Sequence, residues 1–544
     1  MAERIHFASL AAKMLTDERA SVAVPVSPLD RSSFCWTAPS GLPGLDAQEI
    51  AIRVEEGGIG RAWADRYGGS GLGGNGGSGR AGFYRGLYLK GIGPTPLIGK
   101  TTDRHHVSGG AYLEEAVRET VFAELFSIEL PWSAVRTQAI VDTFEDQEWN
   151  PGPDDVEFPI YSERRVVLVR EPFLRPAHLE RAVYFTGDES LTGASDILRT
   201  AQNRIHLVQT FGARQAEMLL RRFWLRWCQQ CAYMYSARLT AGPVCTSNVA
   251  LDGRLLDFGA ASALPDWCAT VVYPGQLENG REFPQIADFI SSFYAEHKDG
   301  SLTNGEASDQ YASALIAECA DFYLRTAGVE ILRLAGLRRV TIETALKSRS
   351  TTQALIQATA AIVKHHLRLF RPSVDRDYPW SEWDFLKFWD DKVAPHFQPM
   401  RKLADDVRSA VRKEPVGARV AGRCKPRERL AQEFFRRRLH GELPKPIRDG
   451  PISPSAIADI VRDEVVQGRR DSRFEPELDI LCGFVSGVSR RFALFRRSDH
   501  TTYAIEEPDD ASHTELEVGS PLSFPFDDSA SIDSEDIRVV NLLN

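Results

Sequence analysis

The sequence predicts an α+β protein of two lobes, the first rich in β-strands and the second mostly helical. Apolar and polar residues alternate in 83–90, and this period of two indicates a strand; the short apolar run Val166–Val169 inside 164–170 indicates another. From 286 to 370, apolar residues recur at helical spacing, which indicates amphipathic helices. An earlier helix with the same spacing is expected at 112–126. The chain of 544 residues is long enough for two or three domains.

The composition is that of an ordinary folded protein, with 43% hydrophobic and 26% charged residues. The formal net charge of -10 argues against a general nucleic-acid binder. The sequence has no apolar run of about 18 residues, and Met1–Leu15 lacks the apolar core of a signal peptide. Eight scattered cysteines fit a reducing compartment. We therefore expect a cytoplasmic protein that does not bind membranes.

A glycine-rich stretch precedes the first strand. Tyr67–Arg80 has eight glycines in fourteen positions. Glycine lets backbone N–H groups approach an anion closely, and kinase-like folds cover phosphates with a glycine-rich turn between strands. A flexible Gly/Ser linker is the alternative. Lys90 favours the phosphate-binding interpretation, because it ends the next strand and is followed by Gly91–Pro96.

Charged side chains on the following elements fit the same kind of site. Glu119 lies beside the apolar stripe of the 112–126 helix and can pair with Lys90, as a helix glutamate does in kinases. Arg170 ends a strand, and Arg175 follows in a proline-flanked loop. The planar guanidinium group suits phosphate, although arginines at strand ends are also common surface residues.

An asparagine and an aspartate farther along the chain are candidate metal ligands. Asn248 and Asp257 lie nine residues apart across a short apolar hairpin, and Asp257 begins an Asp-Phe-Gly tripeptide. In kinase-like folds, such residues supply hard oxygen ligands to Mg²⁺ ions that bridge nucleotide phosphates. A hairpin with a capped turn is the structural alternative.

The joint order of these parts resembles one family, the SelO (YdiU-type) protein adenylyltransferases, over roughly residues 60–265. The most specific element is Leu89–Pro96, which matches the family's Leu-Lys-Gly-x-Gly-x-Thr-Pro. The other matches are Gly77-Ser-Gly-Arg80 for Gly-Asp-Gly-Arg, Arg118-Glu119 for a helix Arg-Glu, Val167–Arg170 for a strand-end arginine, Cys245–Asn248 for Asn-Thr-Asp-Asn, and Asp257–Gly259 for Asp-Tyr-Gly.

The resemblance implies a two-lobed protein-kinase-like fold that binds ATP in a flipped orientation and transfers AMP to a hydroxyl side chain of a protein or peptide. ATP and Mg²⁺ would be the cofactors, with Mn²⁺ as an alternative metal. Lys90 would contact phosphate, Glu119 would orient Lys90, and Asn248 and Asp257 would ligate the metal; these four form the implied catalytic set. The implied nucleotide-binding residues are Gly77, Ser78, Gly79, Arg80, Lys90, Arg170 and Arg175.

The sequence departs from the family pattern at several places. Ser247 stands where the family has the aspartate of Asn-Thr-Asp-Asn, and Ala241-Gly242 replaces its His-Gly. His105–Gly110 replaces a second Gly-Asp-Gly-Arg, and no redox-active cysteine or selenocysteine motif occurs in Val540–Asn544.

The serine at position 247 leaves three functions open. If the family aspartate accepts the proton of an attacking hydroxyl, serine cannot replace it, because its hydroxyl is no base near pH 7. The chain would then transfer AMP to hydroxyls with another base, for which Asp252 is a candidate if the fold turns it inward. Alternatively, it adenylates a carboxylate of a peptide C-terminus or a small acid, which needs no base. The third alternative is a nucleotide-binding pseudoenzyme that scaffolds a partner.

Five segments are expected along the chain. They are a lead-in at 1–45, a β-rich nucleotide-binding lobe at 46–180, a helical lobe with the metal loop at 181–400, a helical extension with a basic segment at 401–505, and an acidic disordered tail at 506–544. From Glu506 onward the tail has eleven acidic residues and one basic residue, Arg538. The tail is a candidate to fold back on the basic segment.

Several other patterns receive a structural interpretation. Cys228 and Cys231 form a C-x-x-C inside a helical run without a second pair, so we expect no zinc site. His365 and His366 are adjacent and cannot both face one metal ion from a helix. The aromatic cluster at 378–389 and the basic run Arg419–Arg438 are expected to be helix packing and a solvated helix, with docking of a partner protein as the alternative.

Overall fold

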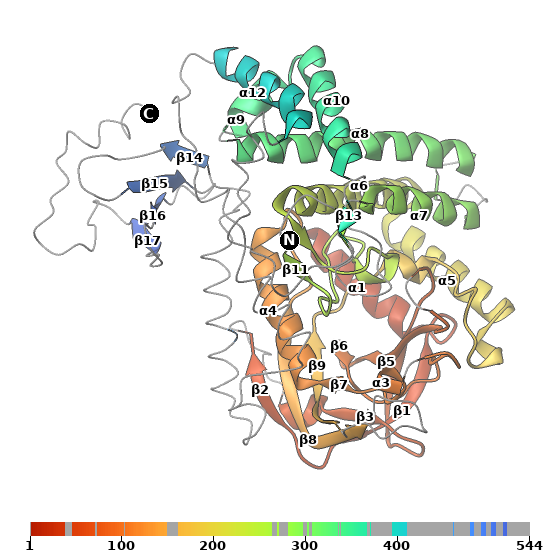
Figure 1. Ribbon diagram of the computed structural model, residues 1–544. Helices are drawn as coiled ribbons and strands as arrows, with labels where there is room; N and C mark the ends of the chain where they lie inside the picture. The colour runs from red at the N-terminus through yellow and green to blue at the C-terminus, as the bar shows by residue number, and fades with distance from the viewer. Residues whose placement is uncertain are drawn as a thin grey trace, which may run out of the picture.

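The computed structural model describes most of the first 410 residues and four strands near the C-terminus (Figure 1). The described residues are 2–38, 46–70, 73–102, 104–149, 161–263, 269–270, 281–297, 302–303, 307–335, 337, 339–366, 370–371, 394–410, 461, 479–482, 491–496, 502–507 and 515–518.

The N-terminal part of the chain forms a curled antiparallel sheet. Its nine strands are β1 (Val22–Pro28), β2 (Ser33–Thr37), β3 (Ile52–Val54), β4 (Gly60–Arg66), β5 (Gly77–Tyr84), β6 (Leu87–Lys90), β7 (Ala111–Tyr112), β8 (Thr137–Trp149) and β9 (Tyr161–Arg170). Within the described residues their order is β2-β8-β9-β6-β5-β4-β1-β3, and β7 pairs with β9. Lys90 lies opposite Ala81 of β5 and Leu168 of β9, so the end of β6 is in the middle of the sheet.

Side chains alternate along the strands and give the sheet two apolar faces. Val24, Leu89 and Val167 belong to a core on the inner face of the curl. On the other face, Leu168 belongs to the larger core that also includes side chains of α1 (Ala2–Thr16) and α4 (Leu113–Glu129). Because α4 packs against β8 and β9, its polar side chains reach the end of β6.

Helices form the second part of the molecule, on the opposite side from the sheet (Figure 1). They are α5 (Ala194–Phe211), α6 (Ala213–Ala237), α7 (Glu282–Glu296), α8 (Ser308–Leu334), α9 (Arg339–Ala345), α10 (Arg349–His366) and α12 (Gln398–Ala410). Helix α6 is the centre of this part, because it packs against α5, α7 and α8 and buries Trp224 and Trp227.

Short elements complete the described chain. They are α2 (Ala47–Ile50), α3 (Arg104–Val107), the 3-10 helices η1 (Pro176–Leu179), η2 (Glu189–Leu191), η3 (Thr246–Asn248) and η5 (Pro395–Phe397), the paired strands β10 (Leu239–Thr240) and β11 (Ser262–Ala263), and the paired strands β12 (Ala269–Thr270) and β13 (Phe370–Arg371). No helix in the described part is long and apolar enough to cross a membrane.

The α+β class and the division into a sheet and a helical part are confirmed. The expected lead-in at 1–45 differs, because β1 and β2 belong to the main sheet. β1 contains Pro25 and Pro28, yet Val24 and Val26 alternate into the core and are each 1% exposed. Burial of these two side chains outweighs the weak strand propensity of the prolines.

The C-terminal segments also differ from the expectation. A helical extension was expected over 401–505, but α12 ends at Ala410, and β14 (Asp479–Cys482), β15 (Arg491–Arg496), β16 (Thr502–Glu507) and β17 (Glu515–Val518) form a four-stranded sheet. Apolar and charged residues alternate in 515–518, which favours a strand even inside an acidic tail. The rest of the tail, the aromatic cluster and the basic run lie outside the described residues.

The structural interpretations of the cysteine and histidine pairs fit the structure. Cys228 and Cys231 are free thiols buried in the core between helices. His366 is 3% exposed, and its Nδ1 lies 2.7 Å from the hydroxyl oxygen of Tyr235. His366 is thus a core residue of α10.

Candidate functional site

The glycine-rich stretch connects β4 to β5, and its described end is anchored. The Gly76 N–H donates to the Leu97 carbonyl at 2.9 Å. Asn75 Oδ1 accepts hydrogen bonds from the Gly99 N–H at 2.7 Å and from Thr102 Oγ1 at 2.5 Å. Residues 73–76 are therefore a fixed loop that leads into β5 rather than a free linker.

The turn after β6 fits against the beginning of β5. Gly91 has a φ of +101°, and a Cβ there would lie 2.5 Å from the Val166 carbonyl oxygen, so the turn requires glycine. Thr95 then donates from its N–H to the Gly79 carbonyl at 2.9 Å and from Oγ1 to the Ser78 carbonyl at 3.0 Å. The segment Leu89–Pro96 thus holds Ser78 and Gly79 of the glycine-rich stretch beside the end of β6.

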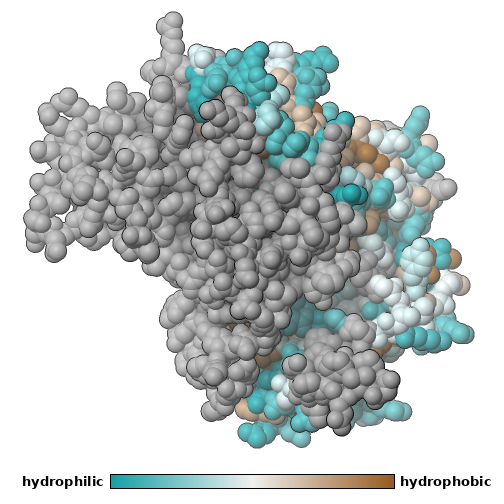
Figure 2. Space-filling view, in the orientation of Figure 1, coloured by the Kyte–Doolittle hydropathy of each residue, from teal (hydrophilic) through white to brown (hydrophobic). Residues whose placement is uncertain are grey.

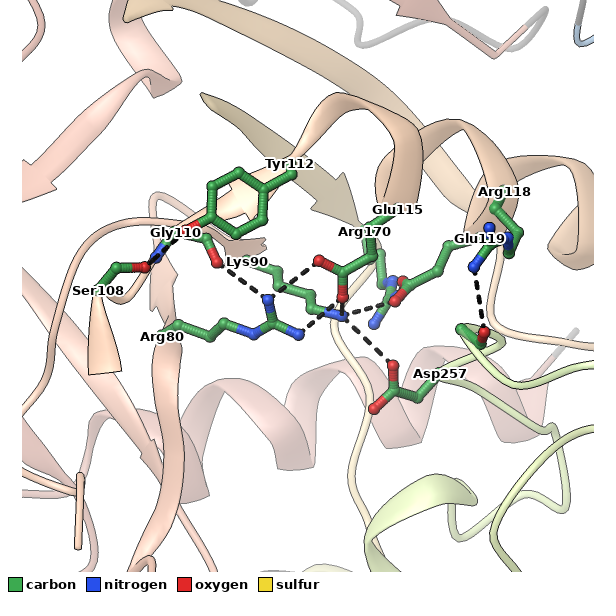
Figure 3. A network of polar contacts seen from close by, with 11 residues as sticks. Arg80, Lys90, Ser108, Gly110, Tyr112, Glu115, Arg118, Glu119, Arg170 and Asp257 are labelled. Atoms are coloured by element: carbon green, nitrogen blue, oxygen red, sulfur yellow. Dashed lines mark hydrogen bonds and ion pairs between the residues drawn. The ribbon is translucent and has the colours of Figure 1, made fainter. Parts of the chain in front are cut away.

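Six charged side chains meet at the end of β6 (Figure 3). We call them the Lys90 cluster: Arg80, Lys90, Glu115, Glu119, Arg170 and Asp257. Three are cations and three are carboxylates, so the formal charges balance. They come from β5, β6, α4, β9 and the loop after η3, which are distant in sequence.

Lys90 is at the centre of this cluster. Its Nζ lies 2.6 Å from Glu119 Oε1, 2.8 Å from Glu115 Oε1 and 3.3 Å from Asp257 Oδ1. The expected pairing of Lys90 with a glutamate of α4 is therefore present, and a second glutamate one helical turn earlier joins it. Lys90 is 6% exposed, so these contacts replace water around its ammonium group.

Two arginines neutralise the other oxygens of the glutamates. Arg80 NH2 and NH1 donate to the two carboxylate oxygens of Glu115 at 2.7 and 3.0 Å, the paired geometry that a guanidinium group favours. Arg170 NH2 donates to Glu119 Oε2. Each glutamate is thus shared by two cations.

The charges within the cluster decide its protonation. Burial opposes ionisation of Asp257, but Lys90, Arg170 and Arg80 hold its pKa well below the usual value. Burial likewise opposes ionisation of Glu115, and Arg80 and Lys90 lower its pKa. The pKa of Lys90 is itself lowered, chiefly by burial and by Arg80. These two carboxylates are therefore ionised at neutral pH.

Glu115, Glu119 and Asp257 each offer an oxygen, and these oxygens lie within 4.8 Å of one another. Lys90 Nζ contacts all three carboxylates, so an ammonium group already lies where a cation would be held by them. This trio differs from the expected metal pair, Asn248 and Asp257, and shares only Asp257 with it.

A tight loop brings Asn248 and Asp257 to the same place. Val249 and Leu255 form an antiparallel bridge, and the Leu256 N–H donates to the Asn248 carbonyl at 3.1 Å. Asp257 has a φ of +66°, which is uncommon for a residue other than glycine and concentrates at functional sites. Its side chain is 44% exposed, so one carboxylate contacts both Lys90 and solvent.

A second polar group lies beside the first. We call it the Asp65 cluster: Asp65, Tyr88, Arg175 and His178. Asp65 Oδ2 accepts a hydrogen bond from the Tyr88 hydroxyl at 2.7 Å and one from Arg175 NH1, and Oδ1 lies 2.8 Å from His178 Nε2. All four side chains are buried.

A cavity of about 420 Å³ lies between these two clusters and the glycine-rich loop. It is lined by Tyr67, Gly73, Gly74, Asn75, Gly77, Ser78, Gly79, Arg80, Tyr88, Lys90, Thr101, Thr102, His106, Arg170, Arg175, Ser247, Asn248 and Asp257. Every nucleotide-binding residue and both metal ligands expected from the sequence are in this lining. Glu119 is outside it and contacts Lys90 from behind.

The face of the molecule shown in space-filling form is mixed in hydropathy over its described residues (Figure 2). Teal, white and brown residues alternate over the helical part, and no single broad apolar area gathers there.

Asp252 and Ser247 are the two residues on which the expected proton transfer depends, and both side chains are engaged in hydrogen bonds with other parts of the protein. The Asp252 carboxylate accepts a hydrogen bond from Arg254 Nε at 2.7 Å and does not line the cavity. The condition for Asp252 to act as a base is therefore not met. Ser247 is 5% exposed, and its hydroxyl donates to the Ser70 carbonyl at 3.2 Å.

Sequence reasoning missed several members of the site. Glu115 lies four residues before Glu119 and so on the same helix face, a signal that was available. Asp65 follows the apolar run Ala62-Trp63-Ala64 in its strand, and an acid beside such a run also indicates a functional or paired group. The cavity residues Tyr67, Asn75, Thr101, Thr102 and His106 carried no such signal.

No protein-family model matches the chain, and a search of curated proteins finds no significant match.

Proposed function

We propose that the chain is a Mg-ATP-dependent adenylyltransferase that transfers AMP from ATP to a hydroxyl side chain of a protein or peptide. The observation that carries this proposal is the cavity whose lining includes the cations Arg80, Lys90 and Arg170 together with the oxygen donors Asn248 and Asp257. Guanidinium and ammonium groups bind phosphate oxygens, and carboxylate and amide oxygens are ligands for Mg²⁺. The resemblance of the motifs to the SelO (YdiU-type) family directs the proposal to AMP transfer.

The donor set fits a magnesium-bound triphosphate. Asp257 is ionised and partly open to the cavity, and Asn248 adds a neutral oxygen beside it. Bound Mg²⁺ would offset negative charge on the phosphates. The chain's own part in transfer is to bind the phosphates with Arg80, Lys90 and Arg170, and so to stabilise charge on the departing pyrophosphate. Glu119 keeps Lys90 in place.

Adenylation of a carboxylate is the second candidate, and the surroundings of Ser247 favour it. When a hydroxyl attacks the α-phosphorus, it must lose its proton, whereas a carboxylate acceptor has none to lose. Asp257, whose oxygens are assigned to the metal, is the sole carboxylate among the described residues that line the cavity. Asp252 is turned to Arg254. The acceptor could thus be a peptide C-terminus or a small acid.

Incubation with α-labelled ATP, Mg²⁺ and candidate proteins or peptides tests the proposal. Label that is stable to hydroxylamine supports transfer to hydroxyls, and labile label or exchange of pyrophosphate into ATP supports an acyl-adenylate. Asp257→Asn is the matched inactive control, because it keeps the shape of the side chain and removes the charge. Transfer of the γ-phosphate instead of AMP would contradict the proposal. ATP binding without any transfer would instead indicate a pseudoenzyme.

The variant Ser247→Asp separates the two acceptor classes. If the missing acid limits transfer to hydroxyls, this variant should label hydroxyl acceptors at least about tenfold faster than the wild type, within the usual contribution of a general base. Ser247→Asn is the control of equal size. Equal rates for wild type and both variants would favour the carboxylate acceptor.

A further inference from the structure

We propose that Asp65 and Arg175 are positioning residues that hold the peptide carbonyl of Ser247 and thereby fix Asn248 at the cavity. The inference rests on the proposed function, in which Asn248 is a metal ligand. It assigns a role to Asp65, which the sequence did not single out, and a role to Arg175 other than direct binding of phosphate.

Asp65 is the fixed point of this arrangement. It lies in β4 of the sheet and is 0% exposed. Its carboxylate accepts from Tyr88 of β6, from Arg175 in the loop after β9, and lies 2.8 Å from His178 Nε2 of η1. Burial would raise its pKa, but Arg175 and His178 lower it well below the usual value, so Asp65 is a buried anion that binds donors from three elements.

Arg175 connects Asp65 to the loop that contains Asn248 and Asp257. Its guanidinium carbon lies 4.4 Å from the ring centroid of Tyr67 and 4.7 Å from that of Phe173, which fixes the plane of the group. NH1 donates to Asp65, NH2 donates to the Tyr88 hydroxyl at 3.1 Å, and Nε donates to the Ser247 carbonyl at 2.7 Å. Each nitrogen thus has a protein acceptor.

The Ser247 carbonyl belongs to the peptide unit that joins Ser247 to Asn248. The other side of this unit is the Asn248 N–H, which donates to the Cys245 carbonyl at 3.0 Å. The peptide plane is therefore held at both ends, once by η3 itself and once by Arg175. Because this plane fixes the N–Cα bond of Asn248, the hydrogen bond from Arg175 restrains the backbone from which the Asn248 side chain starts.

Lysine cannot reproduce this geometry. A single ammonium group lacks the planar fork that contacts a carboxylate and a carbonyl at fixed directions. Arg175→Lys therefore preserves the positive charge at the cavity and removes the hold on Ser247. Asp65→Asn acts from farther away: it keeps the size of the side chain, lies outside the cavity lining and weakens the anchor of Arg175.

Nucleotide affinity with and without metal distinguishes positioning from phosphate binding. Binding of a fluorescent ATP analogue is measured in Mg²⁺ and in EDTA for wild type, Arg175→Lys, Asp65→Asn, Asn248→Ala and the double variant Asp65→Asn/Asn248→Ala. We expect each single variant to lose most of the Mg²⁺-dependent gain, about tenfold, and to keep its affinity in EDTA within about twofold. The double variant should be no weaker than Asn248→Ala, because both changes act on one ligand.

Several results would overturn the inference. Arg175→Lys that binds at least about tenfold more weakly in EDTA would make Arg175 a direct phosphate ligand. Asp65→Asn with an unchanged Mg²⁺-dependent gain would remove Asp65 from the positioning role. Asp196→Asn is the matched control, since it also breaks a buried Asp–Arg contact, to Arg199, away from the cavity. Its cost should appear in stability and leave both affinities unchanged.

Hydrogen exchange tests the hold on the loop without any nucleotide. In Asp65→Asn and Arg175→Lys, amides of 245–256 should exchange about tenfold faster, while those of α8 stay as in the wild type. Unchanged exchange at 245–256, or equal acceleration in α8, would contradict positioning. If the wild type binds no nucleotide but the local acceleration is seen, the proposed function fails and the hold on Ser247 stands.

Discussion

The Lys90 cluster and the Asp65 cluster both contain charged pairs and both border the same cavity, yet they are built differently. In the Lys90 cluster, Glu115 and Glu119 are each shared by two cations, and Asp257 is 44% exposed. In the Asp65 cluster, one carboxylate gathers three donors and no member is more than 5% exposed.

This difference suggests a division of labour. Side chains whose partners are shared can exchange one partner for a ligand at modest cost, because other charges remain close. Side chains that converge on one fully buried anion cannot, because any lost contact leaves a buried charge without compensation. We infer that the Lys90 cluster is arranged to take up an anion and that the Asp65 cluster is arranged to keep its geometry.

Replacement of Lys90 should have the largest effect. Lys90→Met leaves Glu115, Glu119 and Asp257 with one fewer cation among them. Loss of one partner from a buried pair costs about 3–5 kcal/mol, and the remaining arginines place the expected loss near about 3 kcal/mol. Urea unfolding monitored by tryptophan fluorescence measures it. AMP transfer should fall below detection.

The control for Lys90→Met is an ion pair at the surface. Arg221→Met breaks the pair with Glu318, whose two side chains are 49% and 37% exposed, and should cost less than about 1 kcal/mol. Equal losses for the two variants would show that the Lys90 cluster is no more than ordinary surface charge, and the comparison of the two clusters would lose its basis.

The two clusters were not equally visible in the sequence. Lys90, Glu119 and Asp257 could be connected from the sequence, because each lies in a motif whose order along the chain is informative. Asp65 and His178 are separated by 113 positions and meet because the sheet curls and η1 packs against it. No local pattern encodes that approach.

Backbone partners are a second reason why the site was incompletely predicted. Arg175 was expected to bind phosphate because arginine suits it, but its Nε contacts the carbonyl oxygen of Ser247. Every residue type offers such an oxygen, so the sequence carries no sign of it. The strands between 22 and 37 were missed for a different reason, because prolines obscured the alternation of buried valines.

Glu180 tests whether paired charges are what keep the other acids ionised, since its carboxyl has no such pair. Among the described residues no ion pair reaches its carboxyl, and burial raises its pKa to about 8, against the opposite effect of a hydrogen bond with Thr246. The folded state then binds a proton that the unfolded state, with a pKa of 4.5, releases. Its contribution to stability is therefore complete below pH 4.5 and falls as pH rises towards 8.

Glu180→Gln should remove this dependence on pH. Relative to the wild type, the variant should gain roughly 3 kcal/mol in the free energy of unfolding between about pH 5 and pH 8. Urea unfolding at about pH 5, 7 and 9 measures the difference. Glu18→Gln, at a side chain that is 73% exposed, is the control and should show no such trend. A stability difference that is constant with pH would mean that Glu180 is ionised without a partner.

Glu115→Gln should have the smallest effect, and it should strengthen ATP binding rather than weaken it. Glu115 occupies donors of both Arg80 and Lys90, which are the donors that phosphate oxygens would use. Removal of its charge should therefore raise the affinity for ATP in EDTA by about three- to tenfold, or roughly 1 kcal/mol. Isothermal titration calorimetry measures this gain.

Glu119→Gln is the matched comparison, because Glu119 is on the same helix and also contacts Lys90, but its side chain is 1% exposed whereas that of Glu115 is 21% exposed. Its loss should weaken ATP binding, since Lys90 and Arg170 lose the acid that holds them. If Glu115 instead belonged to a metal site with Glu119 and Asp257, both variants would weaken binding in Mg²⁺ and neither would strengthen it in EDTA. A gain for Glu115→Gln alone would mark its carboxylate as the place of a phosphate group.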